Sequence, residues 1–309
     1  MKPRVVVLGA TGQVGLFTVF GLLQAGRTVI AVTRNDEAGA RQMPRGLGRC
    51  DSAGLRGILG EAQPGEPFVL LSCGPADLAL QTLHSLPRDW QGRWERTVVV
   101  GSTSTIVKSK SGVAAERDMV RDIERALAAI RQHCGAKRIP LTILSPTLIY
   151  GCGMDQNLTR VWRWVGRFRI APLAWRPTGL RQPLHVADLG AAIVNAVEGD
   201  PAIDLESPIA GGSTLDYREM IGRLFDAAGY KRRFLRLPDA AFPVVAGLAR
   251  LVPGVAGINS EMLKRQSRDQ VFDDREARSR LAHQPRHFQP SPGDFELPPH
   301  IEEIRKSLI

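Results

Sequence analysis

A glycine-rich turn close to the N-terminus joins a short apolar run to a helical pattern. Residues 4–8 read Arg-Val-Val-Val-Leu, which is typical of a strand buried on both faces. Gly9 and Gly12 allow the backbone to turn sharply and approach a ligand, and Gly15 allows the following helix to pack closely on the strand. Apolar positions within 16–23 then recur at helical spacing. The sequence therefore predicts a strand, a tight turn and a helix.

The N-terminus of this helix is free to bind a pyrophosphate, because its first N–H groups have no partner inside the helix. We therefore expect a dinucleotide at the turn. A glycine turn that binds nothing is the alternative interpretation. The residues expected to contact the dinucleotide here are Gly9, Thr11, Gly12, Gln13, Val14 and Gly15.

The second predicted strand, 28–33, ends at a basic residue. Arg34 suits the 2′-phosphate of NADP, whereas an acidic side chain at this place would bind the ribose 2′-hydroxyl of NAD. We therefore expect NADP as the cofactor. NAD is the alternative, because the acidic Asp36 lies two residues after Arg34. Asp51 follows a weak strand-like stretch and is expected over the adenine, with a helix N-cap as the equal alternative.

Further apolar runs at 67–72, 97–101 and 141–145 alternate with helical patterns. This alternation predicts an α/β fold, a doubly wound parallel sheet of the Rossmann type with helices on both faces. From about residue 153 the strands become short and Arg, Trp and Pro become common. We expect an NAD(P)-binding domain at 1–152, to which 183–198 returns, and a smaller α/β substrate lobe at 153–309.

Polar residues follow the predicted strands, and ligands of open α/β sheets bind at the carboxyl edge. The turn after 67–72 is expected to run beside the cofactor, and the hydroxyl tract after 97–101 to bond a substrate carbonyl or hydroxyl. Ordinary turn residues are the alternative for the tract. The residues concerned are Ser72, Cys73, Gly74, Ser102, Thr103, Ser104 and Thr105.

The chain of 309 residues carries 41 Lys and Arg against 31 Asp and Glu, a net charge of +10. This excess favours polyanionic ligands such as nucleotide diphosphates, anionic lipid surfaces or nucleic acid, and a solvated basic surface is the alternative. Nucleic acid is not expected, because the basic residues are dispersed and no recognition motif accompanies them. Contact with a membrane surface is open but not favoured.

The expected compartment is the cytoplasm. Four cysteines are scattered without metal-ligand spacing and are interpreted as free thiols in a reducing compartment. The first strand begins at residue 4, which leaves no room for a signal peptide, and no apolar run is long enough to span a membrane. No metal is expected.

Four segments together resemble the extended or atypical short-chain dehydrogenase/reductases, a superfamily to which nucleotide-sugar epimerases and dehydratases belong. The segments are Gly9–Gly15, Ser102–Ser104, Pro146–Gly151 and Gln182–Asp188. The resemblance covers nearly the whole chain and implies an NAD(P) cofactor, with Pro146 and Thr147 flanking the nicotinamide and Thr103 at the family's usual hydroxyl position. Homodimers are common in the families that it resembles, and the resemblance does not specify a substrate.

The chain departs from this family at its usual Tyr and Lys, which are four residues apart. None of Tyr150, Tyr217 and Tyr230 has a Lys four residues later, and the family's Tyr position falls on Glu116. Glu116 lies at the start of the apolar stripe Met119, Val120, Ile123, Leu127 and Ile130. A carboxylate facing the sheet favours a functional site, so we expect proton transfer or substrate binding there. A solvated first-turn carboxylate is the alternative.

Several other groups are expected to serve the reaction. Thr103, with Ser104 beside it, is expected to orient the reacting oxygen, and Lys108 or Lys110 to supply charge near the ribose unless both are solvated. In the second lobe, the helical stretch 159–168 places Val161, Trp164, Val165 and Phe168 on one face and three arginines on another. A lid helix packed on the first domain, an arginine row that clamps a diphosphate, and a membrane-surface helix remain open.

The substrate-binding residues expected from these patterns and the resemblance are Tyr150, Asn157, Arg160, Arg181 and His185, the last more often a structural residue. The favoured function is oxidation or reduction, epimerisation or dehydration of a nucleotide sugar or a related carbonyl or hydroxyl compound. The alternative is a non-catalytic NADP-binding structural, assembly or redox-sensing protein, which the missing Tyr and Lys favour.

Overall fold

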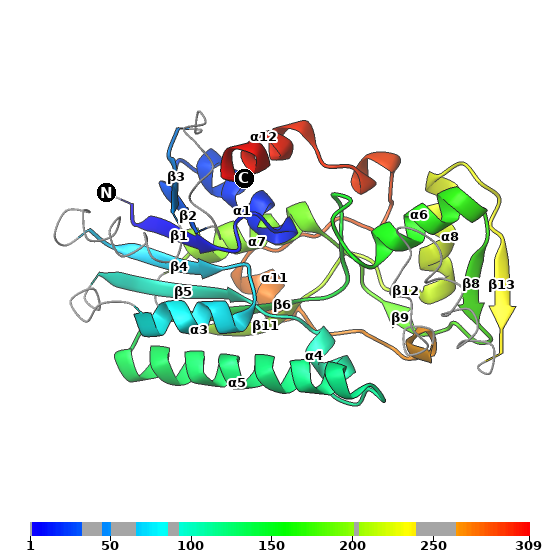
Figure 1. The fold of residues 1–309 in the computed structure, drawn as a ribbon, viewed down its shortest axis with the longest axis horizontal. Helices are drawn as coiled ribbons and strands as arrows, with labels where there is room; N and C mark the ends of the chain where they lie inside the picture. The colour runs from blue at the N-terminus through cyan, green and yellow to red at the C-terminus, as the bar shows by residue number, and fades with distance from the viewer. Residues whose placement is uncertain (1, 33–44, 51–65, 86–92, 201–203, 239–263) are drawn as a thin grey trace.

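The computed structural model describes residues 2–32, 45–50, 66–85, 93–200, 204–238 and 264–309. Its central sheet has seven parallel strands in the order β11-β6-β5-β4-β1-β2-β3 (Figure 1). The chain runs outward from β1 to β3 and then crosses to β4 on the other side of β1, which confirms the predicted doubly wound sheet. The strands are β1 (Arg4–Leu8), β2 (Val29–Val32), β3 (Leu47–Cys50), β4 (Phe68–Ser72), β5 (Trp94–Val100), β6 (Leu141–Pro146) and β11 (Leu205–Ile209).

Helices cover both faces of the sheet (Figure 1). One face carries α1 (Gln13–Gln24), α7 (Val186–Glu198) and α12 (Pro299–Leu308), and the other carries α3 (Ala76–Ser85) and α5 (Ala114–Lys137). Alternate residues of β1 enter the two apolar cores, because neighbouring side chains of a strand point to opposite faces. Among the described residues, no helix combines the length and the apolar character needed to cross a bilayer.

The apolar stripe of α5 faces the sheet with one exception. Val120, Leu127 and Ile130 are buried as predicted, and Ile123 packs against the same core. Met119 is 40% exposed, so its assignment to the stripe was wrong. Adjacent helix positions point about 100° apart, and Val120 occupies the position that faces the sheet.

A smaller lobe lies beyond the carboxyl edge of the sheet (Figure 1). It contains α6 (Leu158–Phe168), α8 (Tyr217–Ala227) and the parallel pair β8 (Ala171–Ala174) and β13 (Phe234–Leu237). Their apolar side chains form a separate core with Phe288 and Phe295 of the C-terminal segment. The remaining elements are α4 (Ser104–Lys108), β7 (Ile149–Tyr150), β9 (Leu180–Arg181), β10 (Leu184–His185), β12 (Leu215–Asp216), η3 (Arg265–Ser267), α11 (Arg275–Arg280) and η4 (Pro292–Phe295).

The predicted face of α6 is only partly buried. Val165 is fully buried in the small-lobe core, whereas Phe168 is 38% exposed. Trp162, which was not assigned to that face, stacks on Phe295 with ring centroids 4.4 Å apart. The helix therefore packs on its own lobe rather than as a lid on the first domain.

Three segments that the sequence assigned to the second lobe pack on the first domain instead. β11 completes the sheet beside β6, α11 packs on β11, and α12 packs on α1. Ile209 and Ile301 are fully buried in the same core as β1. An apolar sheet face and its open edge need cover, and segments far along the chain provide it because sequence distance does not limit packing.

Candidate active site

The turn between β1 and α1 has no room for a side chain at two of its glycines. A Cβ on Gly15 would lie 2.2 Å from the carbonyl oxygen of Gly9. A Cβ on Gly9, whose φ is +70°, would lie 2.6 Å from the backbone nitrogen of Gly74. The N–H of Gly12 donates to the carbonyl of Gly9 at 3.1 Å, which closes the turn. This close approach of backbone to backbone explains the glycine spacing.

The N-terminus of α1 opens at this turn without a cap. Gly12 is the N-cap residue and has no side chain that could accept a hydrogen bond. The hydrogen bonds of the helix begin with the N–H of Leu16, which donates to the carbonyl of Gly12. Gln13 and Val14 line a cleft of about 600 Å³. Among the described residues, nothing accepts a hydrogen bond from the buried Gln13 Nε2. The turn therefore offers unpaired donors to an anion in the cleft.

The loop after β4 packs against the β1–α1 turn and lines the same cleft. The N–H of Cys73 donates to the carbonyl of Leu8 at 2.9 Å, and Cys73 and Gly74 line the cleft. Burial raises the pKa of the Cys73 thiol to about 12, although the Thr18 hydroxyl opposes the shift. The thiol is therefore protonated at neutral pH. Ser72 is fully buried and does not line the cleft.

The hydroxyl tract after β5 lies in the same cleft. Thr103, which is 6% exposed, donates its hydroxyl proton to the carbonyl of Pro146 at 2.9 Å, so its oxygen can only accept from a ligand. The hydroxyls of Ser102 and Ser104 are 2.7 Å apart. The hydroxyl proton of one serine lies in this hydrogen bond, and the hydroxyl proton of the other is free to be donated to a ligand. Pro146 and Thr147 line the cleft, and Thr147 donates to the carbonyl of Gln182.

Glu116 is held in an ion pair at the first turn of α5. Nη2 of Arg265 lies 2.8 Å from Oε1 and 2.7 Å from Oε2 of Glu116. Burial alone would raise the pKa of Glu116, but hydrogen bonds from Arg265 and Ser111 and the charges of Arg265 and Lys108 outweigh it and lower the pKa. Arg265 and Lys108 line the cleft, whereas Glu116 does not. The carboxylate therefore stays ionised and neutralises a cleft-lining arginine.

This ion pair gives a pH-dependent contribution to stability. The pKa of Glu116 is lower in the folded chain than in the unfolded chain, so its contribution is complete above the ordinary pKa and is lost as pH falls through the lowered pKa. We expect Glu116→Gln to lower the free energy of unfolding by about 1 to 2 kcal/mol at pH 7. Urea unfolding between pH 7 and pH 3 should show this difference shrinking as the pH falls.

Glu124→Gln is the matched control, because Glu124 is exposed on the same helix. We expect it to change the free energy of unfolding by less than about 0.5 kcal/mol across the series. A difference between the wild type and Glu116→Gln that stays constant down to pH 3 would contradict the ion-pair account.

The expected substrate-binding residues divide into two groups. Asn157, Arg160 and Arg181 line the cleft. Arg160 bonds to Gln156, while Arg181 is 4% exposed and donates to three backbone carbonyls of the small lobe. Burial lowers the pKa of Arg181, with a smaller opposing effect from Tyr217 and Asp269. Arg181 therefore stabilises the cleft wall through its hydrogen bonds to the backbone.

Tyr150 and His185 do not line the cleft. Tyr150 is 1% exposed, and its ring meets His185 edge-on at a centroid distance of 5.1 Å. His185 caps α7 by accepting from the N–H of Ala187 at 3.2 Å, and its Nε2 lies 3.2 Å from Asp294. These two residues join the small lobe to the first domain. Arg34 and Asp51 lie outside the described residues.

Several residues that line the cleft were not predicted from the sequence, and the charged Arg265 and the phenol of Tyr217 are the most reactive of them. Burial raises the pKa of Tyr217, while the charge of Arg181 and a hydrogen bond with Gln266 oppose the shift. Gln266 and Gln270 line the cleft beside them. The basic run Lys264–Arg268 was visible in the sequence, but only the fold brings it to the cleft.

No family model matches the sequence, and no curated protein matches it significantly. Solved structures match nearly the whole chain. UDP-glucuronic acid 4-epimerase from Bacillus cereus, in complex with UDP-glucuronic acid and NAD, has a TM-score of 0.66 and 14% identity over 97% of this chain and 99% of its own. UDP-glucose 4-epimerase from Thermotoga maritima, with UDP-glucose, has a TM-score of 0.64 and 14% identity over 98% and 99%.

A third solved structure, dTDP-glucose 4,6-dehydratase from Bacillus anthracis in complex with NAD, has a TM-score of 0.65 and 12% identity over 99% of this chain and 96% of its own. At these identities the likeness establishes the shared fold, including both the doubly wound sheet and the second lobe.

Proposed function

We propose that the chain binds a nicotinamide dinucleotide at the β1–α1 turn and acts on a nucleotide sugar or a related carbonyl or hydroxyl compound in the adjoining cleft. The observation that carries the proposal is the uncapped N-terminus of α1, which opens into a cleft at the point where the strand order reverses. The epimerases and the dehydratase of the same fold carry NAD or a UDP-sugar, which supports this choice of ligands.

The residues at the turn fit such a cofactor. Gly9 and Gly15 allow the close backbone packing that shapes the turn, and the unpartnered amide of Gln13 is a donor for a phosphate. The cofactor residues proposed within the described part of the chain are Gly9, Thr11, Gly12, Gln13, Val14, Gly15, Cys73, Gly74, Ser102, Pro146 and Thr147, whereas Ser72 is fully buried and is no longer proposed. Arg34 keeps NADP as the proposed preference over NAD.

A nicotinamide cofactor supplies hydride transfer when it is bound. The side chains of the cleft would then orient the substrate and move a proton. Thr103 accepts a hydrogen bond and so orients a substrate hydroxyl, while the Ser102–Ser104 pair can donate to a substrate oxygen. Because Glu116 is ionised and tied to Arg265, proton transfer falls to this hydroxyl pair or to water rather than to Glu116.

Arg160 and Asn157 of the cleft wall are the groups proposed to meet the substrate's polar end. Arg160 carries the positive charge that a diphosphate needs, and its partner Gln156 is neutral. Arg181 contributes by positioning, since its bonds go to backbone carbonyls.

A non-catalytic dinucleotide-binding protein is the second candidate. It is favoured by the state of the candidate proton-transfer groups: the Thr103 proton is bonded to the backbone, Tyr217 has a raised pKa, and Glu116 lies outside the cleft, paired with Arg265. A protein of this kind would bind the cofactor and report its redox state without turning over a substrate.

Two measurements on the full chain test the proposal. Calorimetry with NAD, NADH, NADP and NADPH should give micromolar binding of at least one of them, and the absence of heat with all four in the folded protein would overturn the proposal. Absorbance at 340 nm with a panel of nucleotide sugars, together with chromatography of the sugars, then separates the candidates. A change in bound cofactor or in the sugar supports the enzyme, and binding without either supports the non-catalytic protein.

A further inference from the structure

The positive charge of the chain is concentrated on the small lobe. The segments 153–182, 215–238 and 264–270 hold fifteen Lys and Arg against five Asp and Glu. The difference of +10 equals the net charge of the whole chain, so the remaining residues carry 26 of each sign and are neutral together. A charge gathered on one end of a molecule gives that end a field that attracts anionic surfaces.

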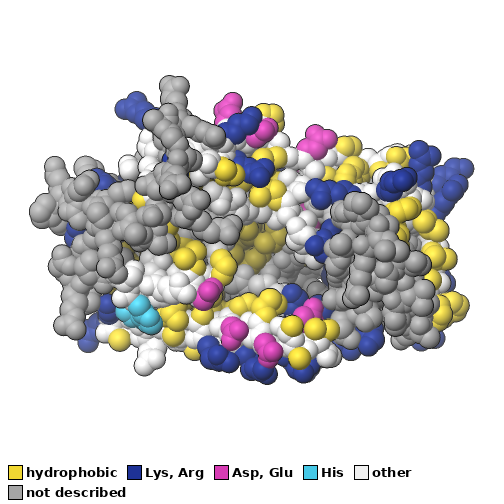
Figure 2. Space-filling view, viewed as in Figure 1, with side chains coloured by type: hydrophobic (Ala, Val, Ile, Leu, Met, Phe, Trp, Pro, Cys, Tyr) yellow, Lys and Arg dark blue, Asp and Glu magenta, His cyan; other side chains and the backbone are white. Residues whose placement is uncertain are grey.

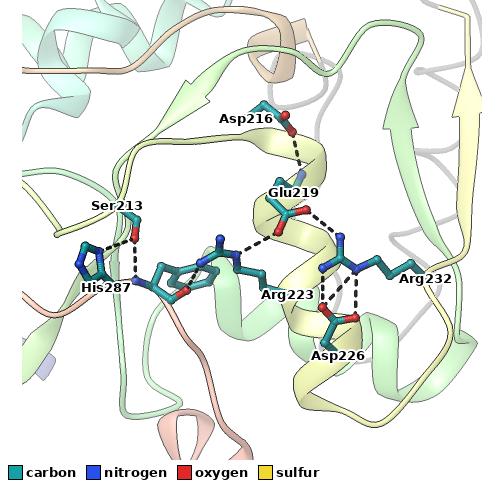
Figure 3. A network of polar contacts seen from close by, with 8 residues as sticks. Ser213, Asp216, Glu219, Arg223, Asp226, Arg232 and His287 are labelled. Carbon is teal, nitrogen blue, oxygen red and sulfur yellow. Dashed lines mark hydrogen bonds and ion pairs between the residues drawn. The ribbon is translucent and has the colours of Figure 1, made fainter.

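The five carboxylates of these segments already have partners. Asp155, Asp216 and Asp269 accept hydrogen bonds from backbone N–H groups. Glu219 pairs with Arg223 and Arg232, and Asp226 pairs with Arg232 (Figure 3). Of the fifteen basic residues in these described segments, the five carboxylates form ion pairs with two, Arg223 and Arg232.

Three large apolar side chains are exposed among these basic residues. Trp175 is 61% exposed, Leu235 48% and Phe168 38%. Leu235 lies on β13 opposite Pro172 of β8, and its neighbour Phe234 packs inward on Phe225, so Leu235 points away from the lobe core. Phe168 precedes β8 and Trp175 follows it.

Basic residues flank these three residues in the sequence. We call the resulting surface the basic end: Phe168, Trp175 and Leu235 with Arg167, Arg169, Arg176, Arg233 and Arg236, all exposed. No ion pair joins any of these arginines to another described residue. Figure 2 shows dark blue and yellow side chains side by side at this end of the molecule, farthest from the central sheet.

We propose that the basic end docks on the surface of an anionic lipid bilayer. Exposed Trp, Phe and Leu side chains on a lobe that also exposes many arginines match the chemistry of the headgroup layer, where aromatic rings enter the interface and arginines pair with lipid phosphates. α6 and β8 also line the cleft, so a docked lobe holds the cleft close to the bilayer.

Co-sedimentation with vesicles tests this proposal. With vesicles of phosphatidylcholine containing 30% phosphatidylglycerol, we expect binding that weakens as salt is raised, and at least tenfold weaker binding to pure phosphatidylcholine. Trp175→Ser combined with Leu235→Ser should weaken binding to the anionic vesicles about tenfold or more. Arg176→Glu combined with Arg236→Glu should weaken it about 25-fold or more, because each lost positive charge near the surface costs about fivefold.

Matched controls lie on the first domain. Ile106 is 61% exposed on α4, and Ile106→Ser should leave vesicle binding unchanged. Arg121→Glu combined with Arg125→Glu makes the same charge change on α5, where both arginines are exposed, and should weaken binding by less than threefold. Thermal unfolding of every variant checks that the fold is kept.

Three outcomes would overturn the proposal. Equal loss in the α5 double variant would mean that net charge alone drives the binding. Full binding by the Trp175→Ser and Leu235→Ser combination would mean that the apolar side chains do not enter the interface. A 20-nucleotide single strand that binds more tightly than the vesicles, and loses binding with the same variants, would assign the surface to nucleic acid. None of these measurements depends on the proposed cofactor.

Discussion

Replacing Gly15 with alanine is expected to weaken dinucleotide binding at least 100-fold. The added Cβ would lie 2.2 Å from the carbonyl oxygen of Gly9 and 2.8 Å from the Cα of Ala10, and both atoms belong to the backbone of the turn. The turn must therefore open, which moves the first N–H groups of α1 away from a common phosphate position. A 100-fold change in Kd corresponds to about 2.7 kcal/mol, within reach of a misplaced anion site. Calorimetry well below the unfolding temperature of the variant measures it.

Two controls separate lost binding from lost stability. Gly211→Ala creates a similar backbone clash, 1.7 Å from the carbonyl oxygen of Pro183, at a glycine that does not line the cleft. We expect it to destabilise the fold by about 1 to 3 kcal/mol and to leave Kd unchanged in the folded protein. Gly135→Ala lies on α5 with open space around its Cβ and should raise the free energy of unfolding by about 0.5 to 1 kcal/mol. A Kd for Gly15→Ala within threefold of the wild type would remove the turn from the proposed site.

The features that could be predicted from the sequence are those encoded over short distances. The β1–α1 turn follows from glycine spacing, because a Cβ on Gly15 would meet the backbone of Gly9 and Ala10 within the same turn. The hydroxyls of Ser102 and Ser104 could be placed at the edge of the sheet because the residue after a parallel strand always lies there. The doubly wound parallel sheet also follows from the alternation of strand and helix.

The rest of the site depends on contacts between distant segments. Glu116 could be found as an unusual carboxylate, but its partner Arg265 is 149 residues away, and nothing local pairs them. Tyr150 and His185 were grouped with the substrate by their motifs, whereas their side chains pack on each other outside the cleft. A side chain's role is decided by which of its atoms face the cleft, and that direction is set by long-range packing.

Arg181 was expected to bind substrate, but its side chain bonds to the backbone, so its replacement should strongly affect stability. We expect Arg181→Ala to lower the free energy of unfolding by about 3 to 5 kcal/mol, measured by urea unfolding. The guanidinium donates to the carbonyls of Leu180 at 2.8 Å, Arg268 at 2.7 Å and Arg265 at 2.6 Å. Its removal leaves carbonyl groups of the small lobe without their donor in a place where water enters poorly, because Arg181 is 4% exposed.

Arg218 provides the matched control, since it is exposed on α8 and its guanidinium lies 5.4 Å from the centroid of Phe234, as that of Arg181 lies 5.4 Å from Tyr217. Arg218→Ala should cost less than about 1 kcal/mol, because it leaves no carbonyl unpaired. Arg181→Lys should fall between the two, since an ammonium keeps the charge but cannot span three carbonyls. If Arg181→Ala instead unfolds like the wild type and only weakens binding of UDP, the guanidinium meets a phosphate rather than the backbone, and the substrate role expected from the sequence would replace the positioning role.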